Sequence, residues 1–144
     1  YYSFHLLLLL ALVAAADIGA FFTGKTFGRL SLAPRVSPNK TWEGFAGGLV
    51  ASGFVITLVS TLLISRVAEV NLQLWLKYFI STLLIASFSV VGDLFESMIK
   101  RFRNVKDSGA ILPGHGGMLD RIDGLTAAVP VYALLVLLMT ADNL

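Results

Sequence analysis

The sequence contains no cysteine, which excludes disulfides, thiol nucleophiles and Cys-ligated zinc. Charge is also scarce: only 14% of the residues are Asp, Glu, Lys or Arg, whereas an average soluble domain carries about 25%. The sequence shows no internal repeat, low-complexity tract or flexible linker. In contrast, 56% of the residues are hydrophobic and the mean hydropathy is +0.80. This composition indicates an integral membrane protein.

Four long apolar runs support this interpretation, because about 20 helical residues cross a hydrocarbon core. They cover residues 4–22, 44–65, 74–95 and 125–141. We therefore predict an all-α, polytopic transmembrane bundle that forms a single membrane domain over residues 1–144. The first run lacks a basic region before it and a small-residue cleavage site, so it is not typical of a signal peptide. Since the chain begins with Tyr1, we expect it to be the C-terminal part of a longer protein.

Basic residues concentrate in two of the segments that connect these runs. Segment 23–43 has four Lys or Arg residues and segment 96–123 has five, whereas segment 66–73 has only Arg66. The positive-inside rule then places the first two segments in the cytoplasm and the third on the other side. In a bacterium this arrangement corresponds to the inner membrane. Because these two segments are rich in ionisable residues and lie on the same side of the membrane, we predict that they form one site together.

The segment that ends at Asp123 has the pattern of a metal and phosphate site. Asp93 and Lys100 share one helical face, and Asp120 and Asp123 share another if a helix starts near Leu119. Carboxylate oxygens suit Mg²⁺, which commonly binds through a few carboxylates and substrate phosphates. Glycines allow the backbone to approach a ligand closely. The predicted metal ligands are Asp93, Asp120 and Asp123. The predicted phosphate-binding residues are Lys100, Arg101, Lys106 and Arg121. The glycines that are predicted to let the backbone of the turn approach the ligand are Gly114, Gly116 and Gly117.

A simpler interpretation is a non-catalytic bundle whose basic face binds anionic lipid. In that case the aspartates are salt-bridge partners of the basic residues. This interpretation does not explain why the sequence HGG is followed by two aspartates that run directly into an apolar span.

The order of motifs in this segment resembles the signature of the phosphatidate cytidylyltransferases, also called CDP-diacylglycerol synthases. The motifs are S-x-hydrophobic-K-R from Ser97, K-D-x-G from Lys106, P-G-H-G-G from Pro113 and D-R-hydrophobic-D from Asp120. Residues 17–44 resemble the upstream motif of the same family. Phe21 stands where the family often has Tyr, which affects one hydroxyl contact. The resemblance covers about residues 15–126.

This resemblance implies an enzyme that joins CTP to phosphatidate and releases pyrophosphate. The implied partners are CTP, phosphatidate and membrane lipids, without nucleic acid, and a homo-oligomer is left open. The implied cofactor is Mg²⁺, with a second metal ion left open. The resemblance adds Asp107 and His115 to the catalytic residues. It adds Asp17, Ser37 and Lys40 to the substrate-binding residues, with the three glycines of the turn.

Ser37 and Pro38 also have a local interpretation, as the N-cap and first residue of a helix that continues into the second span. The free N–H groups of that helix, together with Lys40, then form an end suited to phosphate. The alternative is a capped helix whose Lys40 is merely solvated.

Two further alternatives concern function. Residues 19–26 match the P-loop pattern G-x-x-x-x-G-K-T, but that motif requires a strand before it and a helix after it. Here it follows an apolar run, so we expect the match to be coincidental. The second alternative is a CTP-dependent polyprenol or phytol kinase. Its alcohol acceptor needs a general base, whereas phosphatidate does not.

Overall fold

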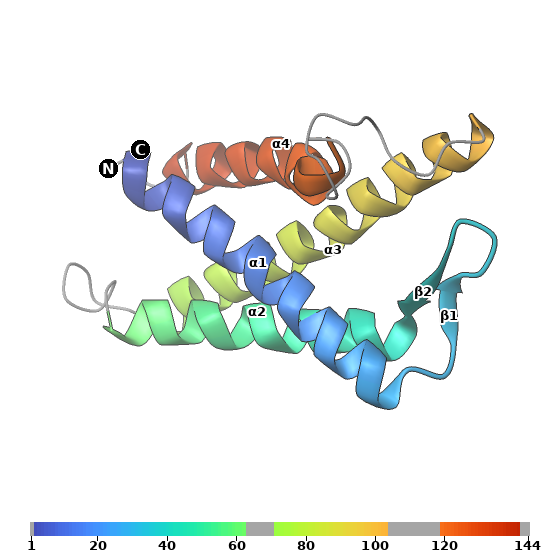
Figure 1. Cartoon of the computed structure of the whole chain (residues 1–144). Helices are drawn as coiled ribbons and strands as arrows, with labels where there is room; N and C mark the ends of the chain where they lie inside the picture. The colour runs from blue at the N-terminus through green and yellow to red at the C-terminus, as the bar shows by residue number, and fades with distance from the viewer. Residues whose placement is uncertain (1, 63–70, 104–118, 142–144) are drawn as a thin grey trace.

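The computed structural model describes residues 2–62, 71–103 and 119–141. Within these ranges the chain forms four helices and one short β-hairpin, so the predicted all-α membrane bundle is confirmed (Figure 1). All four helices are long and apolar enough to cross a membrane. The elements are α1 (Tyr2–Phe27), β1 (Ser31–Ala33), β2 (Ser37–Thr41), α2 (Trp42–Leu62), α3 (Leu72–Phe102) and α4 (Leu119–Ala141).

Segment 23–43 and the described parts of segment 96–123, which were predicted to form one site, lie towards the same end of the bundle (Figure 1). The C-terminal end of α1 and the N-terminal end of α2 lie at the base of the β-hairpin, the C-terminal end of α3 lies towards its tip, and α4 begins beside α3 (Figure 1). The helix α3 has 31 residues, which corresponds to about 46 Å at 1.5 Å per residue. A hydrocarbon core is only about 30 Å thick. The last turns of α3 can therefore project beyond the core and still remain helical.

Glycines allow α1 and α2 to cross at short distance. A Cβ atom on Gly47 would clash with Oγ1 of Thr23, and one on Gly48 would lie 2.7 Å from the carbonyl oxygen of Ala16. A Cβ atom on Gly19 would lie 2.5 Å from that of Ala51. Small residues are the usual means by which membrane helices bring their backbones together. The crossing fixes the end of α1 against the start of α2.

A second glycine contact joins α3 to α4. A Cβ atom on Gly92 would lie 2.9 Å from the carbonyl oxygen of Asp123, and one on Gly124 would lie 2.6 Å from Oγ of Ser89. Apolar packing continues this contact deeper in the bundle, where Ile85 of α3 and Ala128 of α4 are buried in one cluster. The close approach sets Asp123 beside the residues that flank Asp93.

The prediction that a helix starts at Ser37 is wrong. Ser37–Thr41 form strand β2, which pairs antiparallel with β1, and Ser37 lies opposite Ala33. Ser and Pro suit turns and edge strands as well as helix starts, and here the pairing with β1 decides between them. The true N-cap of α2 is Thr41, whose Oγ1 accepts a hydrogen bond from the backbone N–H of Gly44 at 3.0 Å.

Candidate active site at the end of the bundle

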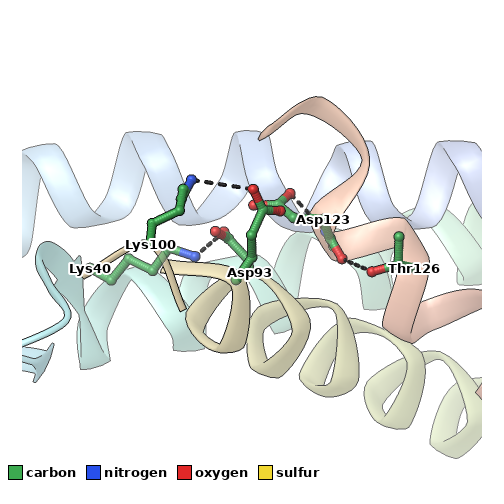
Figure 2. Close-up of polar contacts among 7 residues, drawn as sticks. Lys40, Asp93, Lys100, Asp123 and Thr126 are labelled. Atoms are coloured by element: carbon green, nitrogen blue, oxygen red, sulfur yellow. Dashed lines mark hydrogen bonds and ion pairs between the residues drawn. The ribbon is translucent and has the colours of Figure 1, made fainter. Parts of the chain in front are cut away.

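The last turns of α3 present charged side chains on one face, as the sequence predicted. Asp93, Glu96 and Lys100 follow one another at helical spacing on α3. The Nζ atom of Lys100 is 3.3 Å from Oε1 of Glu96, and Glu96 is buried. Figure 2 shows Lys40, Lys100 and the carboxylates of Asp93 and Asp123 gathered in one region.

The β-hairpin delivers a second lysine to this face. The Nζ atom of Lys40 forms an ion pair with Oδ2 of Asp93, and both side chains are partly buried. The hairpin is also held near its tip, because Nε of Arg101 donates a hydrogen bond to the carbonyl oxygen of Val36 at 3.4 Å. The sequence predicted that Lys40 and Asp93 belong to one site. The ion pair shows that they do lie together.

The electrostatic environment of Lys40 includes two further aspartates. Burial lowers the pKa of the Lys40 ammonium from its ordinary value, whereas the carboxylates of Asp123 and Asp17 act to raise it. The Lys100 ammonium acts in the same direction as burial. Four elements, namely α1, β2, α3 and α4, therefore contribute charges that influence one another.

The first turns of α4 supply Asp123. Its Oδ1 atom accepts a hydrogen bond from the backbone N–H of Gly124 at 2.7 Å. Its carbonyl oxygen accepts one from Oγ1 of Thr126 at 2.6 Å. These two bonds hold Asp123 in the first turns of the helix, and the bond from Gly124 holds one oxygen of its carboxylate. The helix starts at Leu119, which meets the condition under which Asp120 and Asp123 share a face, and the two residues are three positions apart on it.

The donor types in this region fit a hard divalent cation. Asp93 and Asp123 offer carboxylate oxygens from neighbouring helices, which is the chemistry that Mg²⁺ prefers. Among the described residues, however, no group of three His, Asp or Glu side chains is arranged to hold a metal ion. The side chain of Asp120, the third predicted ligand, lies outside what the structure describes. The structure thus brings two of the three predicted ligands to one region.

Several predicted site residues lie outside the described residues. These are Lys106, Asp107, Gly114, His115, Gly116 and Gly117; the backbone of Arg121 is described but its side chain is not. Two other predicted site residues have contacts with the hairpin backbone. Arg101 contacts the hairpin backbone, and Ser37 belongs to the β1–β2 pairing.

The P-loop pattern is a coincidence, as expected. Residues 19–26 lie inside α1, so no strand precedes them and no phosphate-binding loop is formed. Gly19 is a packing contact with α2. The hydroxyl of Thr26 donates to the carbonyl oxygen of Phe22 within the helix, at 2.8 Å.

The predicted site residues did not include Glu96 and Thr41. Glu96 carries a signal in the sequence, because it lies three residues after Asp93 and four before Lys100. Thr41 could have been found as an alternative N-cap, since it precedes the second apolar run as closely as a cap requires. Its Oγ1 is also within 3.1 Å of the positions that Cβ atoms on Gly24 and Gly44 would occupy.

Comparison with known proteins assigns the chain to a family. The sequence profile of the cytidylyltransferase family matches residues 3–139. The phosphatidate cytidylyltransferase of Pseudomonas aeruginosa is 50% identical over 126 residues, which cover 88% of this chain and 45% of that protein. The phosphatidate cytidylyltransferase of Haemophilus influenzae is 47% identical, and the match covers 90% of this chain and 44% of that protein. The chain thus spans somewhat less than half the length of these relatives.

A solved structure shares the fold. It is described as an intramembrane enzyme for archaeal membrane lipid biosynthesis, and it aligns with a TM-score of 0.61 at 20% identity. The alignment covers 94% of this chain and 90% of that one. The match of the family profile to nearly the whole sequence is decisive: the chain belongs to the cytidylyltransferase family.

Proposed function

We propose that the full-length protein is a phosphatidate cytidylyltransferase, which makes CDP-diacylglycerol and pyrophosphate from CTP and phosphatidate. The observation that carries this proposal is the convergence of Lys40, Asp93, Lys100 and Asp123 at one end of a membrane bundle. Cations that can bind phosphate lie there beside carboxylates of the type that binds Mg²⁺. The names of the relatives from Pseudomonas and Haemophilus support the same activity.

The proposed reaction requires little covalent help from the protein. An oxygen of the phosphatidate phosphate attacks the α-phosphorus of CTP, and the bond between that phosphorus and the oxygen that bridges to the β-phosphate breaks. Pyrophosphate leaves with the bonding electrons. The lipid phosphate is already an anionic nucleophile at neutral pH, so no general base is needed. Catalysis then depends on positioning and on stabilising negative charge.

Lys40 and Lys100 suit the role of phosphate-binding groups. They approach the same region from different elements, since Lys40 lies on β2 and Lys100 lies near the end of α3. Each ammonium already has a carboxylate partner, Asp93 for Lys40 and Glu96 for Lys100. A bound phosphate can therefore contact the ammonium groups of Lys40 and Lys100, which the fold already holds in one region.

Asp93 and Asp123, with Asp120, are the proposed ligands of Mg²⁺. When bound, the cation would neutralise charge on the nucleotide phosphates and on the leaving pyrophosphate. Asp93 contacts Lys40 and would change partners to bind a cation, whereas Gly124 holds one oxygen of Asp123 in place. The number of metal ions stays open in this proposal.

The remaining predicted residues complete the proposal. Asp17 acts electrostatically on Lys40 and is proposed to help bind substrate. Lys106, Asp107, His115 and Arg121 are proposed to contact phosphate groups, and Gly114, Gly116 and Gly117 to let the backbone approach them. Ser37 lies on β2, the strand that also carries Lys40, and a substrate contact there is proposed only through this position.

The site is proposed to face the cytoplasm at the membrane boundary. The basic residues of segments 23–43 and 96–123 support this orientation through the positive-inside rule. At such a boundary soluble CTP can meet a lipid that stays anchored in the bilayer. The exposed apolar side chains of the helices, such as Val50 and Leu137, suit contact with that lipid phase.

Product analysis of the purified full-length protein tests the proposal. With CTP, Mg²⁺ and phosphatidate in detergent micelles, we expect one pyrophosphate for each CDP-diacylglycerol formed. Replacing phosphatidate with a polyprenol or diacylglycerol should stop turnover. Release of CDP with an alcohol acceptor would instead identify a lipid kinase. Mg²⁺-independent lipid binding without turnover would identify a non-catalytic protein.

A further inference from the structure

Glu96 is a buried carboxylate to which the proposed chemistry gives no role of its own. It is only 8% exposed and lies on α3 between Asp93 and Lys100. An ionised carboxylate loses favourable hydration on burial, and only a well-placed partner offsets this loss. A nonpolar residue at the same place would avoid that penalty. The contacts of Glu96 therefore indicate what the charge contributes.

A contact of Glu96 that points to this role is with Lys100. The distance from Oε1 of Glu96 to Nζ of Lys100 is 3.3 Å, and the two side chains are 11% and 18% exposed. A lysine side chain has a flexible four-carbon stem, so its ammonium can occupy many positions when it is solvated. A carboxylate one helical turn before it restricts those positions. Figure 2 shows a dashed line from the ammonium of Lys100 to a carboxylate oxygen.

The two lysines have different carboxylate partners. Lys40 contacts Asp93, which is a proposed metal ligand, whereas Lys100 contacts Glu96. We propose that Glu96 is a positioning residue, whose carboxylate holds the ammonium of Lys100 where it binds a phosphate group of the substrates. This inference rests on the proposed function for the nature of those substrates.

The phosphate could belong to the nucleotide or to the lipid, and two measurements distinguish them. One is the Kd of CTP, measured by equilibrium binding to the full-length protein with Mg²⁺. The other is the KM of phosphatidate in mixed micelles. We expect Glu96→Gln and Lys100→Met each to raise one of these two constants about 10-fold. This is the lower end of the effect of a charge-assisted hydrogen bond. Glutamine keeps the size of Glu96 and removes only its charge.

A double-mutant cycle separates positioning from a general structural effect. If Glu96 acts through Lys100, the double variant should bind no more weakly than Lys100→Met alone. Glu96→Asp keeps the charge and should retain more affinity than Glu96→Gln. Glu43→Gln is the matched control, because Glu43 lies on α2 and contacts the backbone N–H of Leu30. Its effect should add to that of Lys100→Met without coupling.

Either of two results would overturn the inference. One is a Glu96→Gln variant with unchanged CTP Kd and unchanged phosphatidate KM. The other is a double variant in which the two losses multiply. Failure of the proposed function has a different signature, since it is the absence of CDP-diacylglycerol from the wild-type protein. The double-mutant cycle can still be measured on the Kd of CTP in that case. A wild-type protein that binds neither CTP nor phosphatidate would overturn both the inference and the proposed function.

Discussion

Lys40 on β2 and Asp93 on α3 form an ion pair although they are 53 positions apart in the sequence. The pair joins the hairpin after α1 to the helix that precedes α4. Since these elements also bring Asp123 and Lys100 near, the pair marks the centre of the proposed site.

The first prediction concerns the proposed metal ligands. Asp93→Asn, Asp120→Asn and Asp123→Asn each remove one negative charge with little change in size. We expect each to lower kcat by roughly 10- to 100-fold or more, as is usual when the surroundings of a metal are disturbed. The measurement is the rate of CDP-diacylglycerol formation as a function of Mg²⁺ concentration. If a variant keeps normal activity and normal Mg²⁺ dependence, the residue that was replaced in it is not a metal ligand.

The second prediction concerns Lys40. Lys40→Met keeps much of the side-chain stem and removes the charge, so binding of CTP or phosphatidate should weaken by roughly 10- to 150-fold. The measurements are Kd and kcat/KM together with the thermal stability in detergent. Lys25→Met is the control, because Lys25 lies on α1 over the ring of Phe21. Equal and modest losses in the two variants would mean that Lys40 contributes only general positive potential.

The third prediction concerns Thr26, which completes the P-loop pattern. Because its hydroxyl is bonded to the carbonyl oxygen of Phe22, Thr26→Ala should change activity by less than about threefold, as expected for one exposed neutral hydrogen bond. Steady-state kinetics with the Asp123→Asn variant measured in parallel provide the test. Complete loss of activity in a well-folded Thr26→Ala protein would restore the P-loop hypothesis.

The fourth prediction concerns the crossing of α1 and α2. Gly48→Ala places a Cβ atom 2.7 Å from the carbonyl oxygen of Ala16, so the helices must move apart. We expect a loss of about 1–3 kcal/mol in stability, as for other overpacked cores, which can be measured as a lower Tm in detergent. Ala46→Leu is the control because Ala46 is exposed on the same helix. An unchanged Tm for Gly48→Ala would show that the crossing can relax.

The fifth prediction concerns orientation, and the lack of native cysteines makes it simple to test. Arg35→Cys in the hairpin and Phe102→Cys at the end of α3 should react with an impermeant maleimide from the cytoplasmic side. Leu72→Cys, at the other end of α3, should react only from the opposite side. Reaction of the first two positions from different sides would separate the two halves of the proposed site.

The sequence predicted the helices well because their signals are strong and local. Each apolar run corresponds to a helix, and the charged face of α3 follows from spacing alone, whereas α4 begins at Leu119, before its apolar run. The hairpin was missed because Ser37-Pro38 is compatible with both a helix start and an edge strand. The outcome depends on pairing with Ser31–Ala33, which single-residue preferences do not encode.

The arrangement of the proposed site could be predicted from the sequence only in part, for similar reasons. Charge and motif order identified Lys40, Asp93, Lys100 and Asp123, because ionisable residues beside apolar spans are rare and conspicuous. Motif order does not reveal which lysine contacts which carboxylate. The pairing of Lys100 with Glu96 depends on burial at the end of α3, and burial at a helix end is set by the other elements.

Transfer of label from CTP tests the central claim most directly. Purified full-length protein is incubated with phosphatidate and Mg²⁺, and with CTP that carries ³²P in either the α- or the γ-phosphate. The account predicts that the α label appears in the lipid and the γ label in pyrophosphate, and that both are lost in Asp123→Asn. The γ label in the lipid, or no transfer by a folded protein supplied with both substrates, would contradict it.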